Sequence, residues 1–230
     1  TSGRIFRISY GVPKKPEKPF AWRRPWPKGD LNSRYEYSRV RGIRELTETW
    51  PLDAITGPLP HAEYPKKEIN DSLHTLLEQA TTDRSSIVQL TLASTLQRLP
   101  LMHRPALAIE LLKHQDNAND PFLSHMVWYG ISPLKADSLL QIAPACSWPK
   151  VTRWIARKLA TEPEALNALL AINSSDDVLE GMAEAFKGIR KAPKPANWDK
   201  VVAASKSPHV RDLSILFGDG RALDDVKKLA

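Results

Sequence analysis

The feature that most constrains this chain is a regular series of amphipathic segments joined by short connections. Each segment is roughly 10–15 residues long, and its apolar side chains recur at the spacing of one helix face. The 19 prolines tend to stand at segment ends, where they do not interrupt a helix. The pattern predicts helices over residues 34–50, 67–81, 83–99, 103–114, 133–142, 149–160, 162–172, 176–190, 198–205, 208–217 and 221–229, with one more beginning at Asp120. The chain is therefore expected to be all-α.

The stretch from Asp120 to Leu134 is very apolar, and we expect it to form the central inner rung of a stack of helices. Asp120 is placed to cap a helix, Pro121 suits the first turn, and the Ser132-Pro133 pair ends it. Gly130 is tolerable where a neighbouring backbone comes close or where the helix ends. The expected apolar stripe comprises Phe122, Leu123, Met126, Val127, Trp128, Tyr129 and Ile131.

Helix pairs recur about every 30 residues, which is the spacing of an α-solenoid. Several second helices open in the same way, at residues 207–211, 148–153 and 82–87. In each, a small polar residue or proline precedes a β-branched residue that should pack inward and an arginine that should point along the groove. This resembles the HEAT-repeat consensus Asp-Pro-x-Val-Arg. The predicted fold is an α-solenoid of HEAT-like helix pairs over residues 31–230, cut before its C-terminal end.

Residues 1–30 read as an extended arm that precedes this solenoid. Residues 3–10 have a short strand signature, and residues 11–29 are basic and proline-rich, with Trp22 and Trp26 interleaved. The arm either docks on a partner or packs its tryptophans back on the protein. Residues 1–44 hold 12 Lys/Arg and 3 Asp/Glu, whereas residues 45–230 hold 21 Lys/Arg and 23 Asp/Glu. The body therefore offers no obvious electrostatic track for a nucleic acid.

Several classes of protein and site are excluded by composition. The single cysteine, Cys146, rules out an internal disulfide, a Cys-only metal site and a Cys-x-x-Cys-His haem attachment within these residues. No apolar run of about 18 residues is present, so no segment of this sequence is expected to span a membrane. The chain opens at Thr1, which indicates a processed product or an excised piece.

Three stretches resemble one known type of protein: residues 93–100, 111–134 and 179–188. They are similar to the HEAT-repeat region of the multidomain haem-binding proteins of planctomycetes and verrucomicrobia, often called putative membrane-bound dehydrogenases. Residues 3–11 resemble the final propeller strand of such a protein, and residues 217–223 resemble a later HEAT repeat. The resemblance implies a parent protein with a β-propeller, HEAT repeats and a cytochrome c domain. It also implies export to the periplasm. Haem c and dehydrogenase activity are implied for that parent only, since this chain lacks both the propeller and the haem motif.

The residues themselves show no catalytic, cofactor-binding or metal-binding motif. The six histidines include no His-x-x-x-His or Glu-x-x-His pair, which disfavours a metal site. A phosphate-binding glycine loop and a nucleophile elbow are also missing from the sequence. The candidate residues for an interaction surface are His125, Trp128, Tyr129, Arg153, Trp154, Arg157, Trp22 and Trp26. For Arg153 and Arg157 the alternatives are an anion or partner patch and a salt-bridged, solvated face.

Three functions are consistent with these observations. The leading one is a non-catalytic solenoid scaffold that positions propeller-like and cytochrome c-like domains or subunits of one assembly. The first alternative is a HEAT-like DNA-binding enzyme of the alkylpurine DNA glycosylase type, although the charge balance of the body argues against specific nucleic-acid binding. The second is a peptide-binding adaptor in which Trp128, Tyr129 and Trp154 are anchors.

Overall fold

A computed structural model describes residues 28–54 and 57–218, and within these ranges the regular structure is all helical apart from one isolated β-bridge between Ala54 and Gly57. The described α-helices are α1 (Glu36–Thr47), α2 (Lys66–Thr82), α3 (Ser86–Thr95), α4 (Arg104–Leu112), α5 (Pro121–Ile131), α6 (Ala136–Ile142), α7 (Pro149–Leu159), α8 (Pro163–Ile172), α9 (Asp176–Ala185), α10 (Trp198–Ala204) and α11 (His209–Leu216). Short 3₁₀ turns occupy Leu96–Arg98, Leu101–His103, Gln115–Asn117 and Ala143–Ala145.

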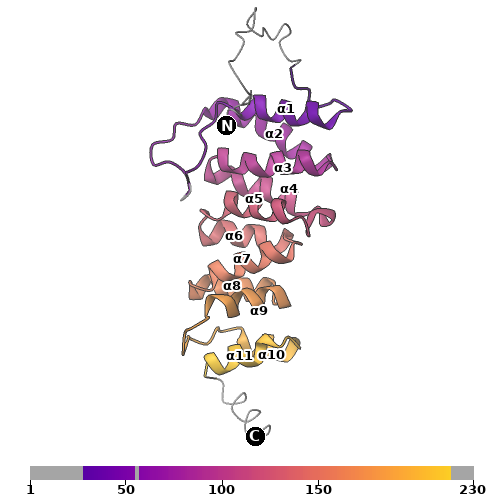
Figure 1. The fold of residues 1–230 in the computed structure, drawn as a ribbon. Helices are drawn as coiled ribbons and strands as arrows, with labels where there is room; N and C mark the ends of the chain where they lie inside the picture. Colours follow the sequence, from indigo (N-terminus) through magenta and orange to yellow (C-terminus); the bar gives the residue numbers. More distant parts are fainter. Residues whose placement is uncertain (1–27, 55–56, 219–230) are drawn as a thin grey trace, which may run out of the picture.

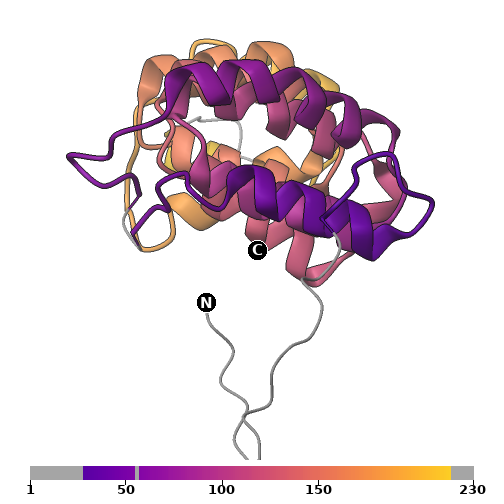
Figure 2. The same ribbon diagram turned by 90° about the horizontal axis from the view of Figure 1, so that it is seen from above.

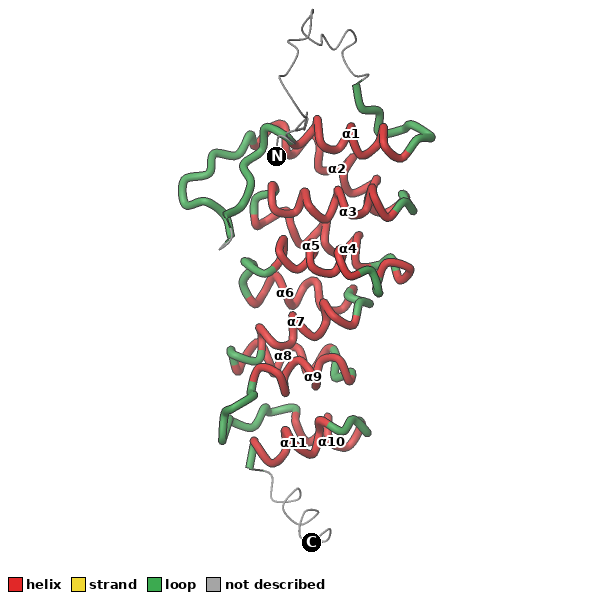
Figure 3. The backbone as a smooth tube through the Cα atoms, viewed as in Figure 1, coloured by secondary structure: helices red, strands yellow, loops and turns green. Residues whose placement is uncertain are grey.

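The helices are stacked in chain order along one direction, from α1 to α11 (Figure 1). Seen along the stack, they fall into two rows (Figure 2). One row, called the odd row, holds the odd-numbered helices, in which α1 packs on α3, α3 on α5, α5 on α7, α7 on α9 and α9 on α11. In the other row, called the even row, α2 packs on α4, α4 on α6 and α6 on α8. Loops lie at the two edges of the stack (Figure 3), which leaves an outer face of each row open along its length.

Helix positions agree with the sequence prediction to within a few residues, with one informative exception. The helix predicted over residues 176–190 ends at Ala185. Gly188 follows with a φ of 85°, in the left-handed region that glycine adopts without strain. Gly188 is thus a stop signal that the periodicity alone did not reveal. The strand signature at residues 3–10 and the helix predicted over 221–229 lie outside the described residues.

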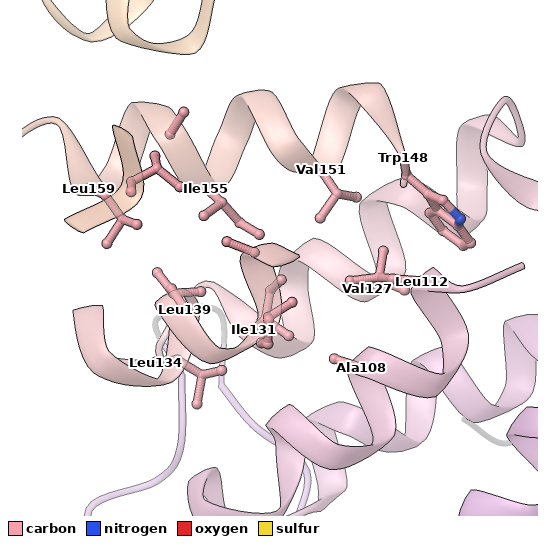
Figure 4. Packing of buried hydrophobic residues seen from close by; sticks show 14 of the residues in the cluster. Ala108, Leu112, Val127, Ile131, Leu134, Leu139, Trp148, Val151, Ile155 and Leu159 are labelled. Carbon is pink, nitrogen blue, oxygen red and sulfur yellow. The ribbon is translucent and has the colours of Figure 1, made fainter. Parts of the chain in front are cut away.

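The hydrophobic core runs continuously between the two rows. Val127 and Ile131 of α5, together with Val151 and Ile155 of α7, are almost fully buried and meet side chains of the even row (Figure 4). Among the described residues, Trp50, Trp148 and Trp198 are buried as well. Burying apolar area on this scale is the main term that stabilises the stack.

The inward-packing prediction for the second helices is confirmed at two positions and wrong at the third. Val151 and Val210 are buried at the starts of α7 and α11. In α3 the predicted residue, Ile87, is 38% exposed, and its neighbour Val88 is buried instead. The extended backbone at Ser85 makes Ser86 the first residue of α3, three residues after the start predicted at residue 83. A one-residue slip turns a helix position by about 100°, which is enough to exchange core for surface.

A buried ion pair ties the connection between α1 and α2 to the stack. The Arg104 side chain is fully buried, and its Nη1 and Nη2 donate to Oδ2 and Oδ1 of Asp53 at 2.7 and 2.8 Å. Arg104 also donates to the carbonyls of Leu99 and Gly130, both at 2.8 Å. The guanidinium therefore joins α4, the end of α5 and a loop distant in sequence. The sequence prediction did not include this pair.

Gly181 marks the closest approach between α7 and α9. A Cβ built on Gly181 lies 2.2 Å from the Arg153 carbonyl oxygen and 3.0 Å from the Ala156 Cβ. Gly181→Ala should therefore lower the free energy of unfolding by about 1–3 kcal/mol through overpacking, although alanine gains about 1 kcal/mol of helix propensity. Urea denaturation followed by circular dichroism measures this change. Ala183→Gly in the same helix is the control, because it loses propensity without adding a contact. A more stable Gly181→Ala protein would contradict the close approach.

Candidate functional site

Four aromatic side chains from α5 and α7 gather on the odd row. The His125 ring centroid lies 5.0 Å from that of Trp154 and 6.3 Å from that of Tyr129. Trp128 and Trp154 are 5.8 Å apart with their planes tilted by 43°. These separations fall in the range of favourable aromatic contact. The fold thus brings together the four aromatic candidates that fall in its described part, while Trp22 and Trp26 lie outside the described residues.

The faces of α5 differ from the predicted apolar stripe. Leu123, Val127, Gly130 and Ile131 face the core, and Asp120 Oδ1 caps the helix by accepting from the amides of Phe122 and Leu123. Two members of the predicted apolar stripe lie outside the core, since Phe122 is 71% exposed and Tyr129, also a candidate for the interaction surface, is 54% exposed. A Cβ on Gly130 would lie 2.3 Å from the Leu96 Cβ, which explains the glycine in this helix. α5 therefore buries one face between its neighbours and presents a second apolar face outward.

That second face of α5 forms one wall of a groove of about 520 Å³. Ile87 and Leu90 of α3 form the facing wall, and Arg44 of α1 stands at one end. The α5 wall is made of Pro121, Phe122, His125, Met126 and Tyr129. Because His125 also contacts Trp154, the groove and the aromatic cluster form one continuous surface. We call this surface the odd-row groove.

His125 is held in one orientation within the groove. Its Nδ1 lies 2.6 Å from the carbonyl oxygen of Pro121, one turn earlier in α5. A carbonyl only accepts hydrogen bonds, so Nδ1 carries a proton and donates it. In neutral histidine this leaves Nε2 as an acceptor. The geometry suits a hydrogen-bonded packing residue at the edge of the aromatic cluster.

Lys158 fixes α7 against the end of α5 and so positions Trp154. Its Nζ donates to the carbonyls of Ser132 and Leu134, the latter at 2.9 Å. These are carbonyls left free where α5 ends, and a lysine is a suitable donor to them. Burial lowers the pKa of Lys158, an effect that Glu162 partly opposes.

Arg153 and Arg157 lie on α7 beside this surface, facing acidic residues of α9. Arg153 Nη2 is 2.9 Å from Glu180 Oε2, and both arginines lie within 4 Å of a carboxylate oxygen of Glu184. Of the two interpretations of these arginines, the salt-bridged solvated face is the one this geometry supports. Exposed pairs of this type contribute roughly 0–1 kcal/mol each.

Arg44 is the charged residue that lines the groove, and the sequence analysis did not single it out. It is exposed, and it has no ion pair or hydrogen bond among the described residues. It also lines a second, polar hollow of about 360 Å³ that contains Thr91, Ser94, Arg98 and Glu48. No local motif identifies Arg44, because the groove takes residues from three helices distant in sequence.

The other titratable candidates are explained by structure. His114 is buried, with Nε2 2.6 Å from the Ala80 carbonyl. Burial raises the pKa of Cys146, whose sulfur accepts from the Thr152 hydroxyl, and this favours the protonated thiol over the reactive thiolate. Across residues 28–54 and 57–218, no three His, Cys, Asp or Glu side chains are grouped closely enough to hold a metal ion. In the same ranges, none of the helices combines the length and hydropathy needed to cross a bilayer.

Comparison of this chain with protein-family models, with curated proteins and with solved structures found no match. The odd-row groove is therefore interpreted from its own geometry.

Proposed function

We propose that this chain is a non-catalytic interaction scaffold, an α-solenoid of HEAT-like helix pairs that docks other protein segments in its odd-row groove. The observation that carries the proposal is the exposed aromatic and aliphatic surface of α3, α5 and α7. Phe122, Tyr129 and Ile87 leave large apolar areas in water along one groove. Contiguous apolar surface rimmed by polar residues is typical of protein-binding sites.

The ordered stacking of the helices supports the scaffold part of the proposal. Successive helices of the odd row, from α1 to α11, pack on one another, an arrangement that gives repeat proteins long binding surfaces. The resemblance described above extends the proposal to a parent protein. In that parent this region would space a propeller-like and a haem c-carrying domain in the periplasm.

A peptide-binding adaptor is the second candidate, and the aromatic cluster favours it. Tryptophan and tyrosine are the residues that most often anchor protein ligands, and Trp154 and Tyr129 flank His125 at the end of the groove. The DNA glycosylase alternative has less support, because Arg153 and Arg157 face the carboxylates of α9. A salt titration with duplex DNA separates the two, because binding that survives physiological salt would favour the DNA-binding enzyme.

Selection from a random peptide display library tests the docking proposal. We expect selected peptides to lose at least about tenfold in affinity when Phe122 or Tyr129 is replaced by alanine, the effect of removing a binding anchor. Fluorescence anisotropy with labelled peptides measures the affinities. Tyr37→Ala is the matched control, because Tyr37 is 70% exposed on α1 and Phe122 is 71% exposed. Peptides that bind both groove variants as well as the original protein would refute the proposal.

A further inference from the structure

The charges around the odd-row groove are arranged asymmetrically. The residues that line the groove include Arg44 and no carboxylate. The adjoining polar hollow adds Arg98 and Glu48. Arg98 already donates to the carbonyl of Trp50 at 2.8 Å. Arg44 is thus the cation at the groove whose donors are unused by the described residues.

The neighbouring hydroxyl groups do not supply further donors to a ligand. The Thr91 hydroxyl donates to the Ile87 carbonyl at 2.8 Å, and the Ser94 hydroxyl donates to the Thr91 carbonyl at 3.1 Å. Their hydrogens are used within α3, so each presents only an oxygen to the groove. A ligand group placed at this end is therefore recognised by the Arg44 guanidinium, which matches the geometry of a carboxylate.

We infer that the occupant of the odd-row groove is an acidic, apolar peptide segment of a partner protein. A carboxylate of the segment pairs with Arg44, and an apolar side chain next to it sits between Leu90 and Phe122. This inference rests on the docking function proposed above and names the chemistry of the ligand. Residues 1–27 hold 7 Lys/Arg and 1 Asp/Glu, which is a poor electrostatic match for Arg44, so the inference commits to a segment of a partner protein.

Three labelled synthetic peptides of 12 residues test the inference by anisotropy. The first alternates aspartate with leucine and phenylalanine, the second replaces each aspartate with asparagine, and the third replaces each apolar residue with serine. We expect the first to bind at least about tenfold more tightly than the other two. The second lacks the carboxylates that pair with Arg44, and the third lacks the apolar side chains that the groove buries. Its affinity should fall as salt is raised, since the pair is exposed.

Charge reversal separates this inference from the docking proposal. Arg44→Glu should weaken binding of the aspartate peptide at least about tenfold. The same substitution should strengthen binding of a version of the peptide in which lysine replaces aspartate. Arg190→Glu is the control, because it makes the same change of charge at an exposed arginine outside the groove. It should leave the affinities of both peptides unchanged. If binding depends on Phe122 but is indifferent to Arg44→Glu, docking stands and the acidic ligand is refuted. If no peptide depends on Phe122, both are refuted. Tighter binding of the asparagine peptide also overturns the inference.

Discussion

Replacing Asp53 with alanine is expected to destabilise the fold by about 3–5 kcal/mol, because it leaves a buried guanidinium without its counterion. Arg104 is fully buried, and the Asp53 side chain is 3% exposed. Both carboxylate oxygens accept from Arg104, at 2.7 and 2.8 Å. The Asp53 backbone amide also donates to the Gln97 carbonyl at 3.0 Å. The loop after α1 is therefore held by both the side chain and the backbone of Asp53. Urea denaturation followed by circular dichroism measures the loss.

The double variant Asp53→Leu with Arg104→Met is the control for this prediction. Removing both charges takes away the unpaired ion, so the double variant should be more stable than Asp53→Ala, as found for other buried pairs replaced by apolar residues. Two carbonyls, of Leu99 and Gly130, would lose a donor in this variant, at a cost of about 1–3 kcal/mol for each group left unsatisfied. A single Asp53→Ala variant as stable as the original chain would show that Asp53 does not neutralise Arg104.

Replacing Trp148 with alanine should lower the free energy of unfolding by about 3–5 kcal/mol, the usual cost of removing a large aromatic side chain from a core. Trp148 is fully buried at the start of α7. Its indole N–H donates to the His114 carbonyl at 3.0 Å, which joins the end of α4 to α7. The variant therefore loses buried apolar area and one hydrogen bond together. Thermal and urea unfolding of the variant measure the change.

Two further aromatic substitutions control for the burial of Trp148. Tyr37→Ala on α1 should change stability by less than about 0.5 kcal/mol, because Tyr37 is 70% exposed. Trp50 is buried like Trp148, but its indole N–H has no hydrogen-bond partner among the described residues. Trp50→Phe removes that unsatisfied donor and should therefore destabilise less than Trp148→Phe. Equal losses for the two phenylalanine variants would contradict a role for the Trp148 hydrogen bond.

Helix type and approximate position were predictable here because they depend on local periodicity and on capping residues. Asp120 is an example, since its cap was read from the sequence and is present in the structure. Which face of a helix is buried was less predictable where two faces of the helix are apolar. In α5 the periodicity is correct, yet Phe122 and Tyr129 are exposed. Which apolar face is buried depends on the neighbouring helices, and α5 turns Gly130 toward Leu96.

The candidate site was predictable in part for the same reason. His125, Trp128 and Tyr129 share one helix, so their proximity followed from the sequence, and Trp154 is added by the packing of α5 on α7. Arg44 could not be found in this way, because its place at the groove depends on the packing of α1 on α3. The buried Arg104 was missed because arginine is seldom buried without a partner, and its partner Asp53 lies in a loop.

The row-by-row contacts of the helices separate the odd-row groove from the far end of the helix stack. The odd-row groove takes its residues from α1, α3 and α5, and α7 completes the aromatic cluster. Helices α10 and α11 contribute none of its lining residues, and α11 packs on α9. Insertions or losses beyond α9 can therefore alter the length of the protein during evolution while the groove keeps its form.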